Sequence, residues 1–90
     1  MSFFSVIMSV EYYRKRLIDL RESVKKEQEA KKKDNAYYAD LIKRTSSASS
    51  KATYRKNKID RAASHDRRIE SLKREIENNK QYLARERAKK

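Results

Sequence analysis

The chain has no glycine and no proline among its 90 residues, and this restricts how it can turn. These two residues are the usual formers of tight turns, so their absence favours long uninterrupted helices. Serine hydroxyls compete for backbone hydrogen bonds and favour turns over helix interiors. The one break is therefore the stretch Thr45-Ser46-Ser47-Ala48-Ser49-Ser50. We interpret residues 45–50 as the tip of a helical hairpin; the alternative is one continuous helix through a polar patch.

A seven-residue repeat of apolar side chains indicates that the two segments beside the tip are helices that pack together. In the first segment, position a holds Phe3, Val10, Leu17, Val24, Lys31 and Tyr38, and position d holds Val6, Tyr13, Leu20, Glu27, Asp34 and Leu41. In the second segment, position a holds Ala62, Ile69, Ile76 and Leu83, and position d holds His65, Leu72, Asn79 and Glu86. Apolar side chains at this spacing form the seam of a coiled coil. We expect helices over about 9–44 and 50–88, with Ser9 as the first N-cap or a start further upstream.

The two repeats agree with one antiparallel pairing about the tip. In this pairing Leu17 faces Ile76, while Asp34 meets His65 in a polar layer that fixes the register of the helices; Asn79 has the same expected role. Two helices alone bury too small a core, so a second hairpin or another protein should complete the packing. We predict an all-α fold in which residues 1–90 form a single long antiparallel two-helix hairpin, a coiled coil completed by self-association or a partner.

The composition bounds the function. Charged residues make up 42% of the chain and hydrophobic residues 37%, and the net charge is +12, which attracts nucleic acid, anionic membranes or acidic proteins. There is no cysteine and a single histidine, and no apolar stretch approaches the roughly 20 residues of a membrane-spanning helix. No phosphate-binding loop or catalytic constellation is present. We predict no enzymatic activity, cofactor, metal site or membrane span, and a cytoplasmic location, with secretion alongside a partner left open.

A basic stretch beside the tip is the candidate nucleic-acid contact. Lysine and arginine neutralise phosphates, and tyrosine stacks on bases. The candidates are Lys51, Tyr54, Arg55, Lys56, Lys58, Arg67 and Arg68. The alternative is the solvated face of a charged helix. The order of residues also resembles a basic-region leucine zipper, but the alanine pair follows Asn57 by five and six residues instead of three and four, which argues against sequence-specific binding to DNA.

Aromatic and apolar residues outside the seam are the candidate protein contacts. In each pair, Tyr12-Tyr13 and Tyr37-Tyr38, one ring falls on the seam and its neighbour to the side, either as a contact for a second subunit or half-buried at the hairpin edge. The apolar stretch at the N-terminal end has few partners within the hairpin. The predicted protein interface comprises Phe3, Phe4, Ile7, Tyr12 and Tyr37.

Several of these features together resemble a known family segment. They are Tyr12-Tyr13-Arg14, Leu17, Leu20-Arg21, the serine run Ser46 to Ser50, and Ile69, Leu72, Ile76 and Leu83. This pattern resembles the N-terminal helical hairpin of some bacterial TIR-type and related defence proteins. The chain is also similar to the helical-hairpin partners of secreted bacterial toxins, although it lacks their Trp-x-Gly turn. Neither resemblance supplies catalytic residues.

The resulting functional prediction is a non-enzymatic bacterial assembly or adaptor protein. It would act through coiled-coil contacts with itself or a larger protein, in a defence or secretion system. The alternative is a basic accessory protein that binds nucleic acid.

Overall fold

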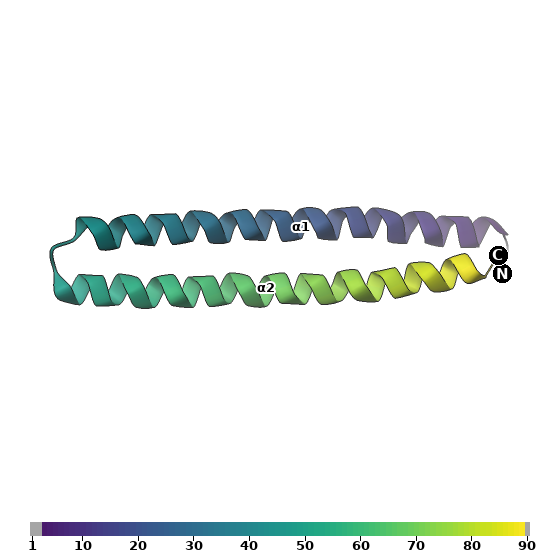
Figure 1. Ribbon diagram of the computed structural model, residues 1–90. Coiled ribbons are helices and arrows are strands. Elements are labelled where there is room, and N and C mark those ends of the chain that lie inside the picture. Colours follow the sequence, from purple (N-terminus) through teal and green to yellow (C-terminus); the bar gives the residue numbers. More distant parts are fainter. Residues whose placement is uncertain (1–2, 90) are drawn as a thin grey trace. The chain divides into compact units, whose positions relative to one another are not determined.

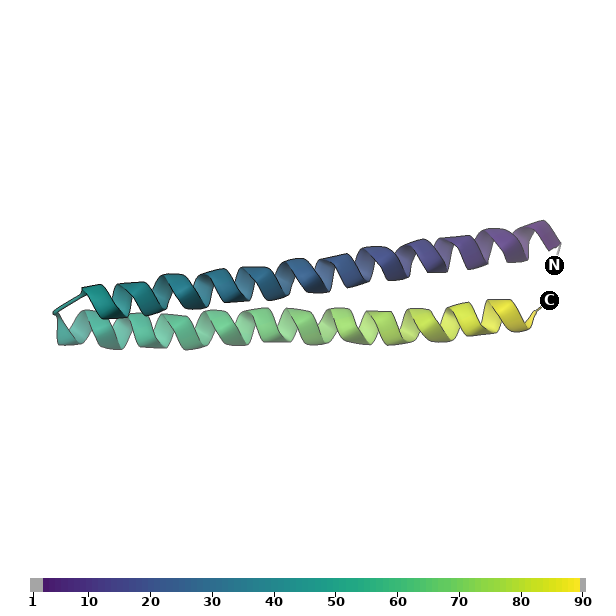
Figure 2. The same cartoon turned by 45° about the horizontal axis from the view of Figure 1, so that its top comes forward.

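The computed structural model describes residues 3–89, and the side chains of Phe3, Phe4 and Val6 lie outside the described part. It confirms the all-α two-helix hairpin. Helix α1 spans Phe3–Arg44, helix α2 spans Ala48–Ala88, and residues 45–47 connect them. Figures 1 and 2 show this order of elements. No helix in the described part of the chain has an apolar stretch long enough to cross a membrane.

Helix α1 begins six residues before the expected N-cap. Ser9 is helical, so its predicted capping role is wrong, and the upstream start is the one observed. The physical reason is that nothing interrupts the helix there: serine in a helix interior costs only about 0.5 kcal/mol relative to alanine. Packing of Val10, 9% exposed, outweighs so small a preference.

The tip is shorter than the sequence indicates. Helix α2 starts at Ala48, so only residues 45–47 are non-helical. The Ser50 amide donates a hydrogen bond to Ser47 Oγ at 3.3 Å, and the Ser47 amide donates one to Thr45 Oγ1 at 3.2 Å. Ser47 Oγ thus caps an amide in the first turn of α2, which a helix start leaves free, and Thr45 Oγ1 binds the amide just before the helix. No described residue has a positive φ, so the turn needs no glycine.

The chain divides into two compact units, each made of one segment of α1 and one of α2. The terminal unit comprises Met1–Val24 and Glu70–Lys90 and holds an apolar core. Its buried apolar residues are Val10, Leu17, Leu20, Leu72 and Leu83. Tyr13 and Ile76 pack against the cluster of Val10, Leu17 and Leu83. Within this core Asn79 is only 7% exposed, and its Nδ2 donates a hydrogen bond to the Tyr13 carbonyl at 2.9 Å.

The tip unit comprises Lys25–Ile69 and is held together differently. Ile69 is its only buried apolar side chain among the described residues. Its two helix segments run antiparallel from the tip (Figure 1), and charged side chains connect them. The tip unit therefore depends on ionic contacts where the terminal unit depends on apolar burial.

Candidate functional site

His65 is the centre of a charged cluster in the tip unit. Its Nδ1 lies 2.6 Å from Glu27 Oε1, and its Nε2 lies 2.6 Å from Asp34 Oδ2. The three side chains are 17–25% exposed. Glu27 and Asp34 stand seven residues apart on α1, so they lie on one side of that helix and bracket the imidazole from α2.

Two arginines complete the cluster. Arg61 Nε lies 3.5 Å from Asp34 Oδ2, and Arg68 Nε lies 3.3 Å from Glu27 Oε2. Each carboxylate is thus shared between the imidazole and one guanidinium. A separate pair, Lys31 Nζ with Asp66 Oδ1 at 2.7 Å, joins the same helix segments. Every one of these contacts crosses from α1 to α2.

The geometry favours the protonated form of His65. A neutral imidazole has one N–H donor, whereas both of these ring nitrogens face carboxylate oxygens. Hydrogen bonds to Asp34 and then Glu27 raise the pKa of His65 above its ordinary value of 6.5, with partial burial acting against them. The same hydrogen bond from His65 lowers the pKa of Asp34 below 3.8, and the charge of Arg61 adds to this effect.

The sequence predicts part of this cluster. The expected approach of Asp34 to His65 is observed, as is the burial of Asn79. Glu27 is a second partner of His65 that was not expected in the polar layer. The spacing of the d positions could have indicated this contact. In the antiparallel pairing, His65 falls opposite the midpoint between Glu27 and Asp34, so it can reach both carboxylates.

The cluster is suited to hold the helices in register. No group of three or more candidate ligands with metal-binding geometry occurs among the described residues. Both imidazole nitrogens are already committed to carboxylates. A buried polar layer of this kind selects one alignment of two helices, because any shift would leave charges unpaired.

Large apolar side chains remain on the surface of both units. In the terminal unit they are Ile7, Met8, Tyr12, Ile18 and Tyr82, and in the tip unit Tyr37 and Ile59, with exposed fractions of 43–68%. Ile7, Tyr12 and Tyr37 belong to the predicted protein interface. The side chains of Phe3 and Phe4, the other two predicted members, lie outside the described residues. Met8 and Ile18 are further exposed residues that the prediction did not include.

Both tyrosine pairs adopt the same arrangement. The rings of Tyr12 and Tyr13 pack edge to face with their centroids 5.2 Å apart, and so do those of Tyr37 and Tyr38. Tyr13 also stacks on Tyr82 at 5.7 Å. One ring of each pair is half-buried, while Tyr12 and Tyr37 are 62% and 60% exposed. The outer rings are therefore free to contact another chain, rather than half-buried at the hairpin edge.

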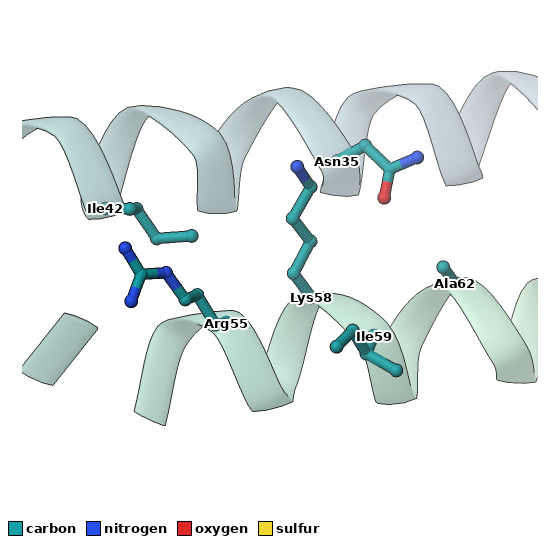
Figure 3. A pocket seen from close by; sticks show the side chains of 6 residues that line it. All are labelled: Asn35, Ile42, Arg55, Lys58, Ile59 and Ala62. Atoms are coloured by element: carbon teal, nitrogen blue, oxygen red, sulfur yellow. The ribbon is translucent and has the colours of Figure 1, made fainter. Parts of the chain in front are cut away.

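The predicted basic residues do not share one face. Lys51, Tyr54 and Lys58 follow one another at helical spacing and are half-buried, whereas Arg55, Lys56 and Arg67 are exposed. Arg68 is engaged by Glu27. In Figure 3, Arg55 and Lys58 extend from α2 toward α1 and line a hollow with Asn35 and Ile42. The structure thus distributes these cations between a hollow and the outer surface.

Comparison with known proteins adds no relative: no family model, curated protein or solved structure matches the chain. The resemblance to hairpins of bacterial defence proteins accordingly stays a prediction.

Proposed function

We propose that this protein is a non-enzymatic assembly or adaptor protein whose helical hairpin packs against other protein chains. The observation that carries the proposal is the distribution of apolar surface. Leu20, at 3%, is the least exposed of the buried apolar residues, and no described side chain is less than 2% exposed. Meanwhile seven large apolar or tyrosine side chains are exposed among those that the structure describes. Exposed apolar surface of this kind is typical of interaction sites.

The charged cluster supports the same function. A binding surface made of helix faces is useful only if the helices keep a fixed alignment. In the tip unit, His65 with Glu27 and Asp34 supplies that alignment without a large core. The resemblance to hairpins of bacterial TIR-type defence proteins supports a role in a defence or secretion system, with the cytoplasm as the proposed location.

The test is recovery of the tagged chain from its native host after chemical cross-linking. We expect a complex with itself or with a larger protein, of fixed composition and unchanged by nuclease treatment. Recovery of the uncross-linked monomer alone, at native expression level, would contradict an assembly function.

Binding of nucleic acid is the second candidate. Within the described chain, Lys51, Arg55, Lys56 and Lys58 form no ion pair, in contrast to Arg61 and Arg68 nearby. Unpaired cations are available to phosphates, and such binding weakens steeply with salt. This candidate predicts nucleic acid that co-purifies at low salt and is lost at high salt or after nuclease treatment.

A further inference from the structure

A second apolar stripe runs along α1 in the terminal unit, away from the core. Ile7, Met8 and Ile18 are 43%, 57% and 66% exposed. With successive helix residues about 100° apart, these three side chains fall within about 100° of each other. Ile18 and the core residue Leu20 are separated by about 200° on the same helix. The stripe is thus an outer face that the hairpin itself does not cover.

Two opposite charges occupy the middle of this stripe. Glu11 and Lys15 are exposed, and neither forms an ion pair with any described residue. They lie between Met8 and Ile18 on the same side of the helix. The order along α1 is therefore apolar, acidic, basic, apolar, at intervals of three, four and three residues.

This spacing is symmetrical, so the face is complementary to its own reverse. We propose that it is an interface between two copies of this chain, whose α1 helices pack antiparallel about a twofold axis between Glu11 and Lys15. Met8 of one copy then faces Ile18 of the second copy, and Glu11 faces Lys15 of the second copy. A twofold axis makes each contact occur twice.

The two charges favour an antiparallel arrangement of the helices. They also favour a second copy of this chain as the binding partner. A parallel pair would set Glu11 against Glu11 and Lys15 against Lys15, and like charges in contact are unfavourable. An unrelated basic or acidic surface would match only one of the two charges. This interface gives the proposed assembly function a specific partner and rests on that function.

Charge reversal tests the pairing. Glu11→Lys places two lysines on the face, and Lys15→Glu places two glutamates on it, so either variant alone meets only like charges in a homodimer. We expect each to weaken dimerisation roughly ten-fold or more. An equimolar mixture of the two should restore dimers, because every facing pair is then attractive. Sedimentation velocity over a hundred-fold concentration range gives the dissociation constants.

Matched controls separate this face from general effects of charge and hydrophobicity. Glu29→Lys and Lys33→Glu make the same changes at the same spacing on exposed residues of the tip unit and should leave dimerisation unchanged. Ile18→Lys should abolish it, whereas Ile59→Lys, at a residue that is 68% exposed on α2, should not. Circular dichroism of each variant checks that the helices persist.

The outcomes distinguish this interface from the assembly function. A wild-type dimer that both single reversals leave intact, or a mixture that stays as weak as its components, overturns the α1 pairing while assembly through another face stands. A wild-type chain that is monomeric at every concentration also overturns the pairing, and the cross-linking experiment in the native host then decides the assembly function independently.

Discussion

His65 links protonation to the stability of the tip unit. Its raised pKa means that folding favours the protonated form, so its contribution is complete below pH 6.5 and is lost as the pH rises through the higher pKa of the folded state. The lowered pKa of Asp34 has the opposite sign: its contribution is present above pH 3.8 and is lost as the pH falls through the lower folded value. Stability should be greatest between about pH 4 and 6.5.

Thermal unfolding followed by circular dichroism at a series of pH values measures this window. In His65→Gln the decline on the alkaline side should vanish, because no titrating imidazole remains between the two carboxylates. Asp60→Asn, an exposed change on the same helix, should retain it. An unaltered alkaline decline in His65→Gln would assign the pH dependence to another group.

Asn79 should fix the alignment of the terminal unit at some cost in stability. Asn79→Leu removes a buried amide that is 7% exposed, so we expect a higher melting temperature together with a less defined register. The chain has no cysteine, so cysteine pairs can report the register. Cysteines that replace Arg16 and Glu75, whose side chains form an ion pair at 3.6 Å in the native chain, should cross-link in both backgrounds.

A pair displaced by one heptad, at 16 and 82, should cross-link only in the Asn79→Leu background. If the displaced pair stays unlinked and the melting temperature falls, Asn79 contributes stability and does not select the register.

The helices depend on the core of the terminal unit more than on their own helix preferences. Leu20 is 3% exposed, and Leu20→Ala should destabilise the chain by about 2 kcal/mol or more. Ile59 on α2 is 68% exposed and lies outside the proposed dimer face, and Ile59→Ala should change the free energy of unfolding by less than about 0.5 kcal/mol. Urea denaturation at one chain concentration, high enough for the wild-type chain to be fully helical, measures both changes; equal losses would contradict the assignment of the core.

The tip should require residues that interrupt the helix. Replacing residues 45–47 with alanine removes the hydroxyl groups that accept from the amides of Ser47 and Ser50. Alanine favours helix, so α1 and α2 should fuse and the chains exchange helices in a swapped dimer. Glycine at the same positions should keep the hairpin. Small-angle scattering distinguishes the forms, and an alanine variant as compact as wild type would show that turning does not depend on these hydroxyls.

The repeat of apolar residues predicted both helices because burial at a and d dominates their packing. It predicted the contact of Asp34 with His65 for the same reason, since both occupy d positions. The sequence could not decide between the two possible starts of α1, because the weak preference of Ser9 for capping competes with a seam that continues upstream. Arg61 and Arg68 precede a positions, and whether such flanking side chains fold over the seam depends on rotamers that sequence does not specify.

The outer stripe of α1 is a feature that the pattern of a and d positions did not predict. Ile7, Met8 and Ile18 lie outside the a and d positions, so a search for one seam assigns them no role. These apolar residues can be recognised in the sequence as a second stripe on α1 once it is known that the a and d face packs against α2. Their exposure on a folded helix is what turns this pattern into a candidate interface.

In the whole molecule, packing between chains should supply stability that one hairpin lacks. Stability from packing falls with dilution, whereas stability from intrinsic helix preference does not. The direct measurement is helicity by circular dichroism and mass by sedimentation equilibrium on the same samples across a hundred-fold dilution. We expect helicity and mass to fall together as the chain is diluted. Constant, high helicity in a chain shown to be monomeric throughout would contradict it.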